Sequence, residues 1–166
     1  MSTPLTPIQV PDQSILDTFN RQAYLGQQFV LPINVTTIAS TSETPLAYIT
    51  NPAGSGKTMF IVSKKYAGND TTFFRLYLGP TVSAPGTSTA VRNMRPACTN
   101  SSISVCYVSP TVSSTGTLLS VVIVNGGYSI DSSSMVILDP GQTLLVTAQA
   151  ASDGDKVSFE MVEYEL

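Results

Sequence analysis

The chain has no histidine and no tryptophan, and only 11% of its 166 residues are charged. Without histidine, neither a Ser-His-Asp nor a Cys-His catalytic relay can form, and no imidazole can bind a metal. Without tryptophan, the chain also lacks a side chain that commonly stacks on sugars. These absences predict a protein that is not an enzyme and that carries no cofactor and no metal.

Basic residues and long apolar runs are also scarce. Eight Lys and Arg stand against eleven Asp and Glu, and the net charge is -3. Nucleic-acid binding needs a basic stripe, which scattered cations do not make. No apolar run approaches the ~20 residues that span a bilayer. The first thirteen residues lack the basic and apolar regions of a secretory signal. We therefore expect no nucleic-acid partner, no membrane and no secretion signal.

The chain has two cysteines, Cys98 and Cys106. Two are too few for a disulfide framework. They could pair across a hairpin, but two reduced, unreactive thiols are the favoured interpretation.

Residues 1–27 differ in composition from the rest and predict an N-terminal arm. Three prolines within the first eleven residues favour an extended conformation, because proline opposes helix both at its own position and at the one before it. Asp12 or Ser14 could then cap a short helix, with Gly26 ending it or the loop that follows. The helix would present one apolar face, a candidate interface: Ile15, Leu16 and Phe19.

From residue 28 onward, short runs rich in β-branched and aromatic residues predict strand after strand. The alternation of apolar and polar positions is clearest at 71–78, 102–108 and 155–164. Nine or ten irregularly spaced strands predict an all-β domain over 28–166, an antiparallel two-sheet β-sandwich with jelly-roll-like connections. The expected strands are 28–37, 44–50, 57–66, 71–78, 87–92, 102–108, 117–124, 134–138, 143–149 and 155–164.

Turn residues separate these runs. Asp139-Pro140-Gly141-Gln142 is the sharpest signal, since proline and glycine in this order predict a type II turn. AGND at 67–70 and NGG at 125–127 are also predicted to end strands. Residues 79–101 form the longest expected loop, and no internal repeat is apparent.

The segment from Asn51 to Thr58, NPAGSGKT, resembles a phosphate-binding loop. Asn51 stands where that motif needs its first glycine. The chemistry also needs a helix after the lysine, whose amides hold the phosphates, whereas MFIVSKKY predicts a strand. We interpret the segment as a glycine-rich turn.

Acidic residues gather at the C-terminal end of the chain: Asp153, Asp155, Glu160, Glu163 and Glu165. Paired carboxylates could perform acid–base or glycosidic chemistry, or bind Ca²⁺. Because they lie at a turn and at a chain end, the favoured interpretation is a solvated sheet edge, where charge also deters unwanted strand pairing.

Arg92 and Arg95 form a small basic cluster in the 79–101 loop, and we take them as further candidate interface residues. Such a low charge is unusual for a free small domain. Chains of this kind are commonly covered by symmetric partners, so we expect a homo-oligomer, with the N-terminal arm as its tether.

The order of features along residues 24–166 is similar to that of a group of tailed-phage structural proteins. The shared features are a short N-terminal arm, the Asn51–Lys57 turn entering an apolar strand, the Pro140-Gly141 turn, and the acidic aromatic end Glu163-Tyr164-Glu165. The resemblance implies a jelly-roll-like virion accessory protein, usually a homotrimer. Such a protein decorates or cements a capsid or forms part of a fibre, and no catalytic residue comes with it.

Two functions follow from the resemblance. The first is a capsid decoration or cement subunit, made in the host cytoplasm and carried on the capsid surface. It would bind the major capsid protein or another virion protein across capsomers, and so stabilise the head by mass action. The alternative is a tail-fibre or receptor-binding domain whose 79–101 loop contacts a glycan. The absence of heptads for a stalk favours the first.

Overall fold

The computed structural model describes residues 21–40, 42–131 and 134–166, and most of them lie in β-strands. The all-β, antiparallel prediction is confirmed. The predicted strand 44–50 has the observed bounds, and the predicted strands 28–37, 143–149 and 155–164 each end one residue before the observed ones. The strands in the described part of the chain are β1 (Gln28–Ile38), β2 (Thr44–Thr50), β3 (Met59–Leu78), β4 (Thr81–Ala84), β5 (Thr87–Thr89), β6 (Arg92–Asn93), β7 (Val105–Val108), β8 (Thr111–Ser114), β9 (Thr117–Asp131), β10 (Val136–Leu138), β11 (Thr143–Ala150) and β12 (Asp155–Glu165).

Helix is confined to residues 21–24 in the described part of the chain. It ends at Tyr24, and Gly26, which was predicted to end the helix or the loop after it, follows in the turn with a φ of 67°. The Gly26 amide donates to the Ala23 carbonyl at 3.0 Å, and the Gln27 amide donates to the Gln22 carbonyl at 2.8 Å. This pair of bonds is the Schellman motif, which satisfies the last carbonyls of a helix. The predicted proline-rich stretch and the apolar face Ile15, Leu16 and Phe19 lie outside the described residues.

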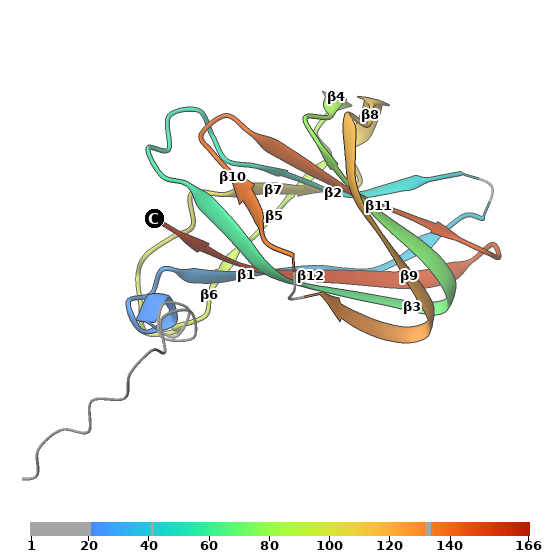
Figure 1. The fold of residues 1–166 in the computed structure, drawn as a ribbon, viewed down its shortest axis with the longest axis horizontal. Coiled ribbons are helices and arrows are strands. Elements are labelled where there is room, and N and C mark those ends of the chain that lie inside the picture. The colour runs from blue at the N-terminus through green and yellow to red at the C-terminus, as the bar shows by residue number, and fades with distance from the viewer. Residues whose placement is uncertain (1–20, 41, 132–133) are drawn as a thin grey trace, which may run out of the picture.

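Ten of the strands form one curled antiparallel sheet, and β4 and β8 form a second, small one. The large sheet has the order β5-β7-β2-β11-β3-β12-β1-β6, and β9 and β10 also pair with β3. Figure 1 shows β2, β7 and β11 lying above β1 and β12. The sheet thus has two arms, a β2–β11 arm and a β12–β1 arm, which are joined through β3.

Strand β3 is a single 20-residue strand, where the sequence predicted two strands, 57–66 and 71–78, with a turn between them. The predicted turn residues Asn69 and Asp70 lie opposite Gly126, the middle of the predicted NGG turn, in a β-bulge between β3 and β9. A bulge bends a strand without ending its pairing. The turn residues were recognised correctly, but they make a corner because they face each other across the ladder.

Asp155 holds this corner and is buried, so the prediction of a solvated turn position is wrong for it. One of its carboxylate oxygens accepts the Asn69 amide at 3.0 Å, and the other accepts the Thr72 hydroxyl at 2.6 Å. A carboxylate with two donors at hydrogen-bond distance meets the requirement that a buried charge be paired.

The hydrophobic core lies between the two arms, and the predicted alternation accounts for most of it. Thr72, Phe74 and Leu76 of β3 are fully buried. The fully buried Tyr66 ring packs 5.1 Å from the ring of Phe74 and 5.4 Å from that of Phe159 on β12, measured between centroids. This aromatic group joins the half of β3 that pairs with β12 to the half that pairs with β11.

The predicted type II turn is present between β10 and β11. Gly141 has a φ of 88°, and the Gln142 amide donates to the Asp139 carbonyl at 3.0 Å. The Gly141 amide also donates to the Asn51 carbonyl at 2.7 Å, so this turn packs directly on the Asn51–Thr58 loop.

The chain contains a short internal repeat, which corrects the sequence interpretation. Residues 80–83 and 110–113 both read PTVS, and Gly-Thr follows each at 86–87 and 116–117. The two copies are β4 and β8, and they pair antiparallel with each other. Two hydrogen bonds mirror one another across the pair: Ser83 donates to the Thr111 carbonyl at 3.2 Å, and Ser113 donates to the Thr81 carbonyl at 3.1 Å.

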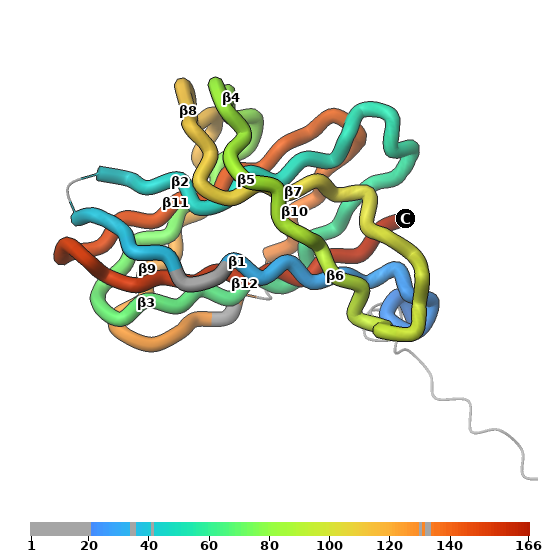
Figure 2. The backbone as a smooth tube through the Cα atoms, turned by 180° about the vertical axis from the view of Figure 1, so that it is seen from behind, coloured from blue at the N-terminus to red at the C-terminus, as the bar shows by residue number. Residues whose placement is uncertain are grey.

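The repeat is arranged about an approximate two-fold axis, and it projects from the body (Figure 2). A Cβ on Gly86 would lie 2.1 Å from the Val108 carbonyl oxygen, and one on Gly116 would lie 2.3 Å from that of Leu78. The end of the first copy, at Gly86, therefore packs on the end of β7, just before the second copy begins. The end of the second copy, at Gly116, packs in the same way on the end of β3, just before the first copy begins. We call residues 78–87 and 108–117 the crossed clip. The predicted 79–101 loop thus contains β4, β5 and β6.

Replacing either glycine of the clip with alanine is expected to destabilise the fold. Both have positive φ, 91° and 84°, and both abut a backbone carbonyl that cannot move aside. We expect Gly86→Ala and Gly116→Ala each to lower the free energy of unfolding by at least about 2 kcal/mol, measured by urea denaturation. Gly54→Ala is the control, since its Cβ meets nothing within 4 Å. Equal stability of all three variants would contradict the crossed arrangement.

Candidate functional site

The C-terminal strand places two carboxylates inside the protein. In β12 every second residue from Asp155 to Glu165 faces the interior. Glu163 and Glu165 are therefore fully buried, and their predicted place on a solvated edge is wrong. Asp153 is exposed in the turn before β12, and Glu160 is half-buried on the opposite face of the strand. Period-two alternation placed Val157, Phe159 and Met161 inward; continued to the end of the strand, it would also have placed the two glutamates.

The segment entering β7 supplies the partners of these carboxylates. The Ser102 hydroxyl lies 2.8 Å from Glu163 Oε1 and 2.7 Å from Glu165 Oε1. Ser104 donates its hydroxyl to Glu163 Oε1 at 2.6 Å, and the Ile103 amide donates to Glu165 Oε1 at 2.7 Å. This acidic cluster links β12 in one arm to β7 in the other. On this segment the serine positions face inward and the apolar positions lie on the other face.

The two carboxylates differ in their charge partners. Glu165 Oε2 lies 3.4 Å from the Lys57 amine, whereas Glu163 Oε2 is buried without a hydrogen-bond partner. Burial raises the pKa of Glu163 to about 7, against the opposing effect of the Ser104 and Ser102 hydrogen bonds. Glu165 adds a smaller repulsion that also raises this pKa. Glu163 therefore exchanges a proton near neutral pH.

Cys106 lies in the same interior region. Burial, and to a lesser extent the charge of Glu163, raise the pKa of its thiol above the ordinary value. Cys98 and Cys106 are both free thiols, in agreement with the favoured interpretation. A buried thiol with a raised pKa is a poor nucleophile.

A polar hollow lies beside Lys57. Its volume is about 390 Å³, and its lining residues do not include the two glutamates. Both carboxylates are fully buried, and their hydrogen bonds to Ser102, Ile103 and Ser104 link the two arms. The hollow is lined by Gly26, Gln27, Phe29, Lys57, Thr99, Asn100 and Ser101.

The segment that resembles a phosphate-binding loop is followed at Met59 by strand β3, as predicted. The Asn51 side-chain amide donates to the carbonyls of Lys57 and Leu138, both at 2.8 Å. Lys57 turns its amine to Glu165. The loop thus uses its polar groups to join β2, β3 and β10.

The structure brings one predicted interface residue, Arg95, to the end of the N-terminal segment. Its guanidinium donates to the Tyr24 carbonyl and lies 5.1 Å from the centroid of the Tyr24 ring. The Asn93 side-chain amide donates to the Gly26 carbonyl at 2.9 Å, which holds the end of the N-terminal segment beside this contact. Arg92 is exposed on β6, where it pairs with Val30 of β1.

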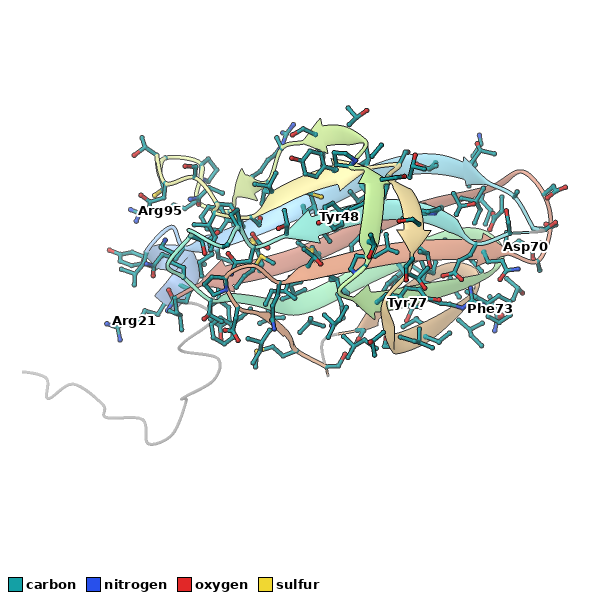
Figure 3. All side chains as sticks on the ribbon, turned by 90° about the horizontal axis from the view of Figure 1, so that it is seen from above. Arg21, Tyr48, Asp70, Phe73, Tyr77 and Arg95 are labelled. Carbon is teal, nitrogen blue, oxygen red and sulfur yellow. The ribbon has the colours of Figure 1, made fainter. Side chains whose placement is uncertain are left out.

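Apolar side chains are exposed around Arg95. Tyr24 is 74% exposed, and Leu25 and Met94 are also exposed. We call Tyr24, Leu25, Met94 and Arg95 the helix-end patch. Sequence reasoning placed the apolar face of the arm further upstream, at Ile15, Leu16 and Phe19, which lie outside the described residues. Figure 3 shows Arg21 and Arg95 at one end of the body and Asp70 and Phe73 at the other.

A second group of exposed apolar side chains follows β9 and β10. It was not predicted, because an alternating strand has the same sequence pattern whether its outer face meets solvent or a partner. The group contains Leu118, Leu119, Val121, Ile123, Tyr128, Met135 and Ile137.

Comparison with known proteins gives this chain no family. No family model matches it, and no curated protein is significantly similar to it. Within the described residues, no helix has the length and apolar character needed to cross a membrane, and no three potential metal-ligating side chains gather at one point.

The pKa of Glu163 predicts how stability depends on pH. The folded protein holds this proton up to about pH 7, whereas an ordinary glutamate loses it near 4.5. The contribution of Glu163 to stability is therefore present below about pH 4.5 and is lost as the pH rises through about 7. A shift of this size corresponds to roughly 3 kcal/mol.

We expect Glu163→Gln to remove this dependence. The variant should be more stable than the wild type at pH 8, and its thermal midpoint should change less between pH 5 and pH 8. Glu160→Gln, on the opposite face of the same strand, is the charge-matched control. If both variants follow the wild-type pH profile, the interior protonation of Glu163 is disproved.

Proposed function

We propose that this protein is a non-enzymatic structural subunit of a phage virion, which decorates or cements the capsid. The observation that carries the proposal is the helix-end patch, an exposed group of apolar side chains around a cation, positioned where the N-terminal segment joins the body. Aromatic residues, methionine and arginine are the types enriched in protein–protein interfaces.

The curled sheet would serve as a rigid body, with its two arms acting as the layers of a jelly-roll-like sandwich. The helix-end patch and the preceding arm would contact the major capsid protein or another virion protein on the capsid surface. Low charge supports this role, since a surface with few charges loses little hydration when it is covered.

The resemblance noted above supports the virion assignment. It rests on turn chemistry. The Asn51–Thr58 loop and the Asp139–Gln142 turn pack on each other and hold three strands in place.

A tail-fibre or receptor-binding role is the second candidate, and one observation favours it. Tyr48 and Tyr107 stack with their ring centroids 6.1 Å apart, and both are half-buried. Tyr107 lies opposite Ser88 of β5, so hydroxyl groups border the pair. Aromatic rings beside hydroxyl groups can recognise a glycan.

Binding to phage heads tests the first role. The full-length protein should co-sediment with heads of the encoding phage that were assembled without it, and it should raise their thermal stability. Arg95→Glu should weaken this binding at least about tenfold, the effect of losing an interface anchor. Lys156→Glu makes the same charge change on an exposed position of β12 and should leave binding unchanged.

Failure of the wild-type protein to bind heads would overturn the decoration role. A glycan array then tests the second candidate. Glycan binding that Tyr107→Ala abolishes would assign the protein to receptor binding.

A further inference from the structure

The large sheet has an open edge along β9. Residues 117–125 pair with β3 on one side, and no strand in the described part of the chain pairs with their other side. Half of the backbone N–H and C=O groups of an edge strand point outward and can pair with another strand. β9 has 15 residues, and such an edge is long by the standard of globular proteins.

This edge lacks the features that usually protect one. Proteins block open edges with charged residues, proline, short strands or covering loops. No charged residue and no proline occurs between positions 117 and 130. Of the eleven large apolar side chains that are exposed in the described residues, seven belong to β9, β10 and the residue before β10. We call these seven the β9 strip: Leu118, Leu119, Val121, Ile123, Tyr128, Met135 and Ile137.

The charge opposite the first half of β9 is already neutralised. Arg75 lies opposite Val121 on β3, and its guanidinium is 3.7 Å from a Glu43 carboxylate oxygen. Phe73 lies opposite Ile123 and extends the apolar surface onto β3. Lys65 lies 5.8 Å from the centroid of the Tyr128 ring, beyond the bulge at Gly126. Residues 117–125 themselves carry no charge that would select a charged partner, whereas a second apolar, uncharged edge matches them.

We propose that residues 117–125 of β9 pair with the same residues of a second copy of this chain, antiparallel about a two-fold axis. In an isologous contact the same surface meets itself, so an edge strand that pairs with its own copy must run antiparallel to it. An axis at Val121 places Leu119 of one copy opposite Ile123 of the other. The β3–β9 ladder then continues across the interface as one sheet.

The axis at Val121 fixes how much of β9 pairs. Residues 117–125 lie on both sides of the axis, and at ~3.3 Å per residue this segment is about 30 Å long, ending before the bulge at Gly126. Phe73 lies at the opposite end of the body from Arg95 (Figure 3), so pairing leaves the helix-end patch accessible.

Light scattering on a sizing column tests the pairing. The full-length protein should have twice the chain mass of 17.6 kDa. Val121→Lys should shift it to the monomer, because two ammonium groups would meet at the axis. Thr81→Lys, on the exposed strand β4, should remain dimeric, and circular dichroism should show that both variants are folded.

A cysteine at the axis gives a second, geometric readout. Opposed residues of an antiparallel pair have Cα atoms about 4.5–5.5 Å apart, within reach of a disulfide. In a Cys98→Ser background, Val121→Cys should form a covalent dimer on oxidation, and Lys156→Cys should not. A monomeric wild type, a trimer of the kind that the resemblance implies, or a dimer unaffected by Val121→Lys would each overturn the pairing. None of these outcomes depends on whether the protein binds phage heads.

Discussion

The bend in strand β3 is the constraint on which the rest of the structure depends. Because β3 continues through the bend, it pairs with β12 before it and with β11 after it, and each of these strands begins one arm of the sheet. The bend needs the Asn69-Asp70 bulge, the glycines opposite it on β9, and the Asp155 carboxylate that holds Asn69 and Thr72.

Two sets of polar contacts lie at different places along the interior between the arms. Asp155 acts at the corner, and the acidic cluster of Glu163 and Glu165 joins β12 to the segment before β7. Between them lie the aromatic contacts of Tyr66. Polar groups in a low-dielectric interior are strong when satisfied and costly when not. Glu163 has one satisfied oxygen and one unsatisfied oxygen, which makes it the part of this interior that responds most to proton concentration.

Local patterns in the sequence predicted the strands well, and they predicted long-range consequences poorly. Alternation and turn residues located β2, β11 and β12 nearly to the residue, because these signals act within one strand. Alternation continued to the end of β12 would have placed Glu163 inward, but its partner Ser104 lies 59 residues away, and no local window contains both. The bend in β3 was missed for a related reason: turn residues look alike whether they end a strand or oppose one another in a ladder. Arg95 was identified as a candidate, but its contact with Tyr24 depends on how the arm packs.

The crossed clip bears on how the chain comes apart and comes together. β3 ends at Leu78 and its partner β9 begins at Thr117, so residues 79–116 separate these two paired strands in the sequence. β5 and β7 lie within that segment and pair with each other. Gly86 packs on the end of β7 and Gly116 packs on the end of β3, so we expect a shift of register in one pair to require the other pair to open. Contacts of such long sequence separation form slowly. We expect the same geometry to slow unfolding, so that the folded protein would persist through a slow rate of opening, a kinetic property separate from its free energy of folding.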